Sequence, residues 1–112
     1  MITIRLDEYE DRKELFVKGH ADYDVPGKDI VCAAVSILVY TLLESIDESI
    51  LKRPALAILN PGNTYVRVDI GNAENGHTEE AFNVVSNGFS ILSKDFPKNV
   101  EFFRRRLIEK QK

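Results

Sequence analysis

The apolar residues of this chain repeat first with the period of a strand and then with the period of a helix, in the same order in each half. Residues 2–8 alternate between apolar and polar side chains, which is typical of a half-buried strand, and a second strand is expected over residues 13–20. Residues 29–52 place apolar side chains at steps of three and four, which predicts a helix with one buried stripe. The second half repeats this plan, with strands expected at residues 55–60 and 64–70.

The second predicted helix carries signals at both of its ends. Thr78 is expected to cap the N-terminus, because two glutamates that suit the positive end of the helix dipole follow it. Gly88 lies inside this helix, and its poor helix propensity indicates close packing against another backbone. Pro97 closes the helix, and residues 100–106 are expected to form a last short strand.

These elements predict an α+β fold of two layers. In the order β-β-α-β-β-α-β, two helices with one apolar face each would pack on one face of a mainly antiparallel sheet. A chain of 112 residues has the length of about one domain, so residues 1–112 are expected to form a single domain. The other face of the sheet is either polar enough for water or partly covered by a second copy of the chain; its expected polar residues are Arg5, Asp7, Arg67 and Asp69.

The composition narrows the class of protein. A single cysteine cannot form an internal disulfide, so stability must come from packing, and a reducing cytoplasm is the simplest compartment. No apolar run approaches the length of a membrane span, so no membrane association is expected. The net charge of −3 argues against direct nucleic-acid binding. The basic cluster at residues 104–106 is interpreted as a charged strand edge or a solvated tail, with a weak docking patch for an RNA-rich or acidic partner as the alternative.

The cysteine lies where the first helix is expected to begin. With Asp29 as the N-cap, Cys32 falls in the first turn, where unpaired backbone N–H groups favour a thiolate over a thiol. Cys32 also lies on the flank of the apolar stripe, in a row with Ser36, so the thiol can touch the core and still be reached from the preceding loop. A small hydrophobe buried in the core is the alternative interpretation of a lone cysteine. The flanking position favours an activated nucleophile.

His20 ends the second predicted strand, at the other end of the same loop. An imidazole there can take the thiol proton and return it to a leaving amine near neutral pH. A strand-end histidine hydrogen-bonded to a loop carbonyl is the alternative. Asp29 is expected to cap the helix first and to orient His20 second, with Asp22 and Asp24 competing for the orienting role. The N–H groups of residues 28–32 are the predicted oxyanion hole.

Other residues near the cysteine have weaker roles. Ser36 is expected more often to bond back to a helix carbonyl than to assist a nucleophile. Gly19 lets the strand end bend or a substrate backbone approach closely, and Gly27 gives the loop over residues 21–28 freedom to swing. His77 is given no role. One cysteine and two histidines fall short of a zinc ligand set, and no phosphate-binding glycine motif occurs, so neither a metal nor a cofactor is expected.

The run Gly19-His20-Ala21, followed by Gly27 and by DIVCAAVS at residues 29–36, closely resembles the signature of the ribosomal-processing cysteine protease family, Prp. The resemblance implies that His20 and Cys32 are the catalytic pair, in a small homodimer of a two-layer α+β fold with a mobile loop over the site. It also implies the substrate. This is the precursor of the twenty-seventh protein of the large ribosomal subunit, whose short N-terminal extension is cut off after a stretch that contains phenylalanine.

Such an extension would bind in extended form beneath the loop, which would act as a lid. Apolar contacts to its aromatic residues are expected from Tyr23, Val25 and Pro26. Two other functions fit the same residues. A non-enzymatic, ribosome-associated module would clamp the peptide and leave Cys32 inert, and a redox sensor would use Cys32 in an intermolecular disulfide.

Overall fold

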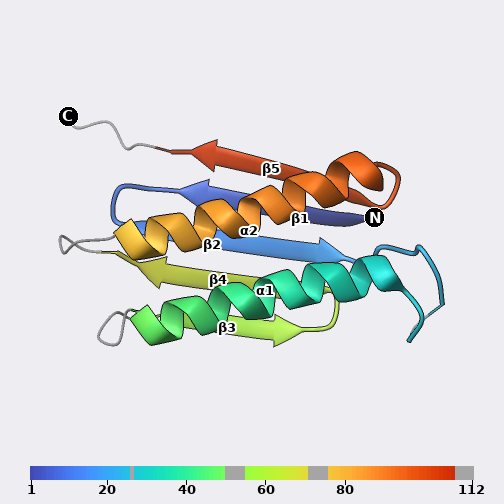
Figure 1. Cartoon of the computed structure of the whole chain (residues 1–112), viewed down its shortest axis with the longest axis horizontal. Coiled ribbons are helices and arrows are strands. Elements are labelled where there is room, and N and C mark those ends of the chain that lie inside the picture. The colour runs from blue at the N-terminus through green and yellow to red at the C-terminus, as the bar shows by residue number, and fades with distance from the viewer. Residues whose placement is uncertain (26, 50–54, 71–75, 108–112) are drawn as a thin grey trace.

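The computed structural model describes residues 1–25, 27–49, 55–70 and 76–107, and within these ranges the chain forms five strands and two helices (Figure 1). The predicted order of elements is confirmed, and the strands begin and end within one residue of their predicted bounds. Residues 50–52, the predicted end of the first helix, and Pro26 lie outside the described residues. The elements are β1 (Ile2–Glu8), β2 (Arg12–Gly19), α1 (Ile30–Ser49), β3 (Ala55–Asn60), β4 (Asn63–Asp69), α2 (Gly76–Asp95) and β5 (Val100–Arg106).

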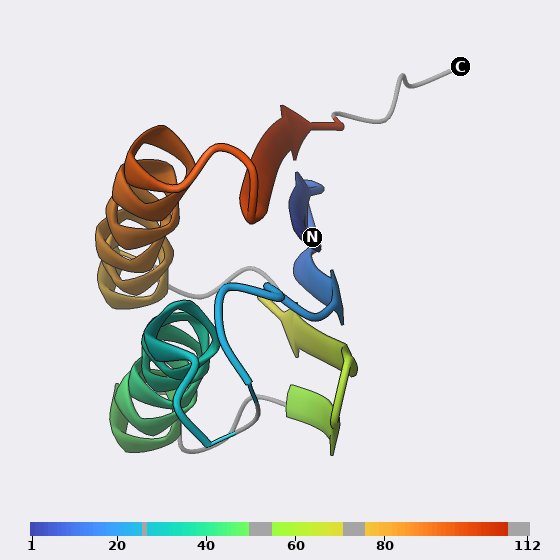
Figure 2. The same ribbon diagram turned by 90° about the vertical axis from the view of Figure 1, so that its right-hand side faces the viewer.

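The strands form one sheet in the order β3-β4-β2-β1-β5. Three of the neighbouring pairs are antiparallel, and β1 and β5 run parallel. Both helices lie side by side on one face of this sheet, as the end-on view in Figure 2 shows. The predicted two-layer α+β fold with a mainly antiparallel sheet is therefore confirmed. No helix in the described part of the chain is both long and apolar enough to cross a membrane.

The core lies between the helices and the sheet. Alternate residues of β1 face the helices, with Ile4 and Leu6 almost fully buried, as the period of two predicts. The helices contribute Val35 and Leu42 from α1 and Phe82 from α2 to the same cluster. Each such side chain stabilises the fold by roughly 1.5–3 kcal/mol when it leaves water. This burial explains how a chain without a disulfide holds its layers together.

Two predictions about α2 need correction. The helix begins at Gly76, so Thr78 lies inside its first turn and does not cap it. The physical reason is burial. Thr78 lies one helical turn before Phe82 and on the same face, so a helix that begins before Thr78 buries this residue against the core. Gly88 does mark a close approach, but to a side chain rather than a backbone, because a Cβ added there would lie 2.8 Å from Cδ2 of Leu38.

The basic cluster Arg104, Arg105 and Arg106 ends β5 and is a charged strand edge, not a solvated tail. Arg105 donates two hydrogen bonds to Asp7 at 2.9 and 3.0 Å, and Arg104 donates two to Glu8 at 3.0 and 2.9 Å. Burial raises the pKa of Glu8, but the hydrogen bonds from Arg104 and Lys13 outweigh it and lower that pKa to about 2. These arginines therefore serve the fold by neutralising buried carboxylates.

Candidate active site

Asp29 joins the loop to the first turn of α1. One of its carboxylate oxygens accepts the backbone N–H groups of Val31 at 3.0 Å and Cys32 at 2.9 Å, which is the bonding of an N-cap. The other oxygen accepts the N–H groups of Tyr23 at 2.9 Å and Asp24 at 3.3 Å. Burial raises the pKa of Asp29, but these four backbone hydrogen bonds outweigh it and lower the pKa. A single carboxylate thus fixes both the loop and the start of the helix that carries the cysteine.

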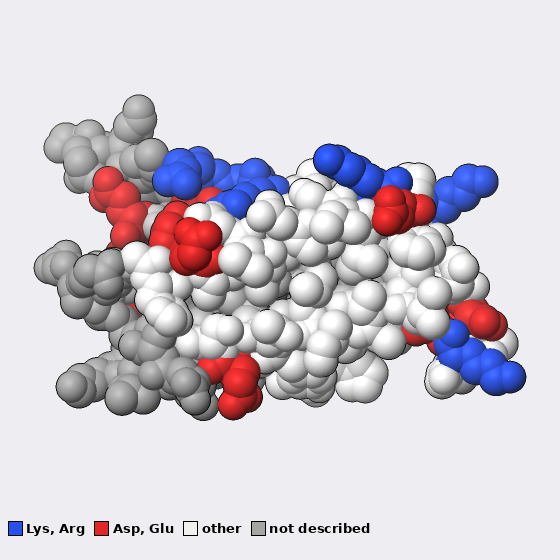
Figure 3. All heavy atoms as spheres, viewed as in Figure 1, with Lys and Arg blue, Asp and Glu red and all other residues white. Residues whose placement is uncertain are grey.

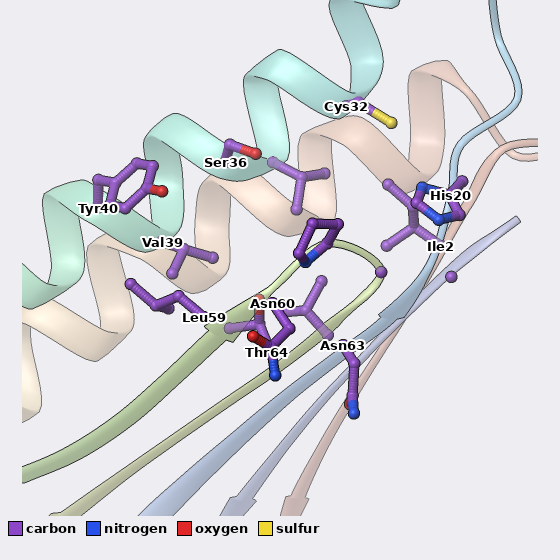
Figure 4. A pocket seen from close by; sticks show the side chains of 15 residues that line it. Ile2, His20, Cys32, Ser36, Val39, Tyr40, Leu59, Asn60, Asn63 and Thr64 are labelled. Carbon is purple, nitrogen blue, oxygen red and sulfur yellow. The ribbon is translucent and has the colours of Figure 1, made fainter. Parts of the chain in front are cut away.

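The thiol of Cys32 is half-buried in the first turn of α1. Its sulfur accepts a hydrogen bond from the backbone N–H of Ala21 at 3.4 Å. In Figure 4 the sulfur points from α1 toward the segment that carries His20. The position on the flank of the buried stripe, expected from the spacing of apolar residues, thus leaves the sulfur beside the end of β2.

His20 follows β2 directly and is exposed. Its ring lies against Gly62 in the β3–β4 turn, where an added Cβ would be 2.8 Å from Nε2. A hydrogen bond from the N–H of Gly19 to the carbonyl of Gly62, 2.9 Å long, ties the end of β2 to this turn. Within the described part of the chain no hydrogen bond reaches the imidazole, either from Cys32 or from an aspartate. The pairing of His20 with Cys32 therefore stays a prediction.

His20 and Cys32 line one end of a groove of about 370 Å³ between α1 and the β3–β4 hairpin (Figure 4). The groove runs along α1 toward Tyr40 and Leu59, and its walls combine apolar side chains with polar ones such as Asn60 and Thr64. Sequence reasoning did not place the hairpin in the site, because the Pro-Gly-Asn run was interpreted as a turn alone. The residues that line the groove are Ile2, Val17, Gly19, His20, Cys32, Val35, Ser36, Val39, Tyr40, Leu59, Asn60, Pro61, Gly62, Asn63 and Thr64.

A second pocket, of about 570 Å³, lies on the loop side of the same residues. It shares His20, Cys32 and Ser36 with the groove, so the two hollows meet at the cysteine. Ser36 forms no hydrogen bond to a helix carbonyl among the described residues, contrary to expectation, and its side chain is exposed. The remaining residues that line this pocket are Asp22, Asp24, Gly27, Asp29 and Ala33.

The predicted loop residues occupy different places. Ala21 is buried, and the ring of Tyr23 packs edge-on against Phe96 with the centroids 5.4 Å apart. Neither Tyr23 nor Val25 lines either of the two pockets described above. Gly19 has a φ of +95°, and a Cβ there would collide with the carbonyl oxygen of Met1, so this strand end needs glycine.

Part of the predicted oxyanion hole is already engaged in other hydrogen bonds. Of the N–H groups in residues 28–32, that of Lys28 donates to the carbonyl of Val25, and those of Val31 and Cys32 donate to Asp29. The N–H groups of Asp29 and Ile30 have no acceptor among the described residues, so within residues 28–32 the oxyanion hole stays a prediction for these two alone. The described residues also contain no group of three or more His, Cys, Asp or Glu side chains placed to hold a metal ion.

A half-buried thiol at a helix start, beside a histidine and open to a groove, has the arrangement of a thiol hydrolase. Residues 1–101 match the model of a family described as cysteine protease Prp. The chain belongs to this family and is a cysteine protease. Family membership favours this function over the peptide clamp and the redox sensor considered from the sequence.

Solved structures share the fold. The Prp ribosomal processing protease of Staphylococcus aureus with a covalently linked product peptide is 17% identical, with a TM-score of 0.80, over 94% of this chain and 100% of that one. The same protease with a substrate peptide is 15% identical, with a TM-score of 0.72 and the same coverage. SMU.848 from Streptococcus mutans is 24% identical, with a TM-score of 0.69, over 95% of each chain. No curated protein matches the chain in sequence.

Proposed function

We propose that this chain is the endopeptidase that removes the short N-terminal extension from the precursor of the twenty-seventh protein of the large ribosomal subunit, in the cytoplasm. The observation that carries the proposal is the groove, because Cys32 and His20 line one end of it and an extended peptide can enter it. The peptides bound by the S. aureus relative, a ribosomal processing protease, support the same class of substrate. The protease domain spans residues 1–112, and the reaction uses no metal or cofactor.

In this mechanism the sulfur of Cys32 attacks the scissile carbonyl carbon, and the thiol proton moves to His20. His20 returns that proton to the departing amine, so the first product leaves with a new N-terminus. The imidazole then takes a proton from water, which attacks the thioester and frees the second product from the sulfur. The apolar wall at Val39, Tyr40 and Leu59 receives the aromatic residues of the extension, a role that the sequence had placed in the loop.

A cleavage assay on the precursor peptide, read by product mass, tests the two catalytic residues. Cys32→Ala and His20→Ala are each expected to lower kcat by about 10⁴-fold or more, as in other enzymes with a nucleophile and base. His77→Ala is the matched control, because His77 is exposed on α2 and lines neither pocket. Full activity in either of the first two variants would remove that residue from the mechanism.

We also propose that the chain acts as a homodimer through the outer face of its helices. Isolated exposed apolar residues are ordinary, but here four of them lie on two adjacent helices, and Figure 3 shows a broad band without charged side chains across the middle of this face. The outer face of the sheet instead carries ion pairs such as Arg67 with Asp69, at 2.8 Å, and suits water. The four helix residues, 58–61% exposed, are Ile30, Ile37, Val84 and Ile91.

Light scattering on the purified protein tests this surface. Ile37→Asp and Val84→Asp are each expected to shift the mass from two chains to one, because a buried unpaired charge is costly in an interface. Phe103→Asp, on the outer face of the sheet, is the control and should leave the mass unchanged. A dimer that survives both helix variants would place the interface elsewhere.

A further inference from the structure

Ala21 lies in a loop, yet three contacts hold it. Its side chain is only 1% exposed, its N–H donates to the sulfur of Cys32 at 3.4 Å, and its carbonyl oxygen accepts a hydrogen bond from Nδ2 of Asn99 at 2.8 Å. Asn99 follows 78 residues later, in the turn between α2 and β5. This turn lines neither pocket, although it contacts the segment that carries His20.

The turn that carries Asn99 is itself well anchored. The N–H of Asn99 donates to the carbonyl of Phe96 at 2.9 Å, and its own carbonyl accepts the N–H of Ile2 at 2.8 Å. The backbone of Asn99 is therefore fixed to both the end of α2 and the start of β1. The ring of Phe96 also receives the ring of Tyr23, with the centroids 5.4 Å apart, so the turn meets the loop at a second point.

The backbone just after Ala21 is strained. Asp22 has a φ of +57° and is the only non-glycine residue with positive φ in the described ranges. An L residue adopts this conformation at a cost, which persists where the surroundings determine the path of the chain. Here the carbonyl of Ala21 is held by Asn99 on one side, and the N–H of Tyr23 is held by Asp29 on the other. The strain marks a segment whose direction is fixed from both ends.

We propose that Asn99 is a positioning residue for the protease reaction, and that it aims the Ala21 N–H at the sulfur of Cys32. The inference rests on the proposed function. As the sulfur bonds to the scissile carbonyl carbon, the thiol proton passes to His20 and an electron pair of the carbonyl moves to its oxygen. The Ala21 N–H then donates to that oxygen, a task for which the N–H groups of Val31 and Cys32 are not free.

Steady-state kinetics on the precursor peptide tests Asn99. Asn99→Asp keeps the size of the side chain but faces the Ala21 carbonyl with a carboxylate, and Asn99→Ala removes the donor. Both are expected to lower kcat, by about 10- to 100-fold for the aspartate, with KM changed by less than about threefold, because the donor acts on the reacting atoms. Asn83→Asp makes the same change on the side of α2 that contacts β5, where its Oδ1 can still accept the hydrogen bond from Arg104, and should match the wild type. A kcat within about twofold of wild type in both Asn99 variants would overturn the proposal.

Alkylation of Cys32 by iodoacetamide provides a readout that needs no substrate, because the chain has one cysteine. Asn99→Asp is expected to slow alkylation at neutral pH by about threefold or more, since an N–H aimed at sulfur favours the reactive thiolate. A purely structural Asn99 would lower the melting temperature and leave alkylation and kcat of the folded protein unchanged, against the proposal. A failure of the proposed function would be seen separately, as cleavage of the precursor by Cys32→Ala. Slower alkylation in Asn99→Asp than in Asn83→Asp would still support the positioning role in that case.

Discussion

At the end of the sheet where β1 and β5 finish, buried acidic and basic side chains neutralise one another, whereas at the end where β2 finishes His20 and Cys32 remain open to the groove. Lys13 is 3% exposed and lies 2.8 Å from Glu8 and 3.0 Å from Glu79. At the site, by contrast, Asp29 and Asn99 hold the chain through backbone groups. Ion pairs therefore stabilise the fold at the first end of the sheet. At the other end, hydrogen bonds to backbone groups hold the chain in place, and the side chains of His20 and Cys32 are left open to the groove.

Removing one charge from the paired end should have the largest effect on stability. Glu8→Gln keeps the shape but leaves Lys13 and Arg104 without the carboxylate between them, which is expected to cost about 3–5 kcal/mol in the free energy of unfolding. Urea unfolding measures this loss, with Glu10→Gln in the exposed β1–β2 turn as the control. The folded variant should still cleave the precursor, because Glu8 lies far from the groove. A loss below about 1 kcal/mol would mean that the network acts like surface ion pairs.

The same network predicts how acid unfolds the protein. The pKa of Glu8 is about 2 in the folded protein, below its usual value of 4.5. Between these two pH values the unfolded chain therefore binds more protons than the folded protein does. The stability from Glu8 is therefore fully present above pH 4.5 and is lost as the pH falls through about 2. Asp7, whose pKa Arg105 lowers, acts in the same direction. When the melting temperature is measured at decreasing pH, it should fall less steeply in Glu8→Gln than in the wild type. Parallel curves for the two proteins would contradict the lowered pKa of Glu8.

At the open end, Gly62→Ala should disturb the site more than the fold. Gly62 has a φ of +73°, so a side chain costs about 1–2 kcal/mol, and its Cβ would lie 2.8 Å from Nε2 of His20. The imidazole must move, which is expected to lower kcat about tenfold. Gly27→Ala offers a comparison, because its φ is +87° but an added Cβ meets nothing within 4 Å. At a similar loss of melting temperature, Gly62→Ala should lose more kcat; equal losses would show that Gly62 does not set the ring position.

The fold was largely predictable because each element carries its own period. The alternation in β1 and the apolar stripe of α1 show which face of each element is buried, and both patterns can be recognised from neighbouring residues alone. The start of α2 was missed because a cap signal at Thr78 competed with burial of that residue, and burial depends on the whole fold. The role of Arg105 was open for a similar reason, since its partner Asp7 is set by the register of β5 on β1.

The candidate site was predictable only where its residues are close in sequence. Asp29 precedes a helical pattern and has the side chain of a cap, so its bonds to α1 followed from local rules. Gly62 and Asn99 reach the site through strand pairing and the α2–β5 turn, and a single sequence does not contain the order of strands. The local rules did not show that the cap and the predicted oxyanion hole compete for the same N–H groups, of which the cap uses those of Val31 and Cys32.

The smallest effect on stability is expected from Asp29, and two substitutions there separate its two tasks. Asp29→Ala removes the cap and should cost about 1 kcal/mol in the free energy of unfolding. Asp29→Asn should cost only a few tenths, because asparagine caps helices as well as aspartate does. Its amide oxygen can still accept the N–H groups of Val31 and Cys32, but its NH₂ group cannot accept those of Tyr23 and Asp24.

The asparagine variant therefore releases the loop while the helix start stays in place. If the backbone scaffold is what keeps the open end ready for chemistry, Asp29→Asn should lower kcat/KM by about three- to tenfold at nearly unchanged stability, through a loop that no longer holds its position over the cysteine. Cleavage kinetics and urea unfolding on the same samples decide this. Wild-type kinetics in Asp29→Asn, together with a loss in Asp29→Ala, would mean that the helix cap alone matters and that the bonds to Tyr23 and Asp24 only accompany it.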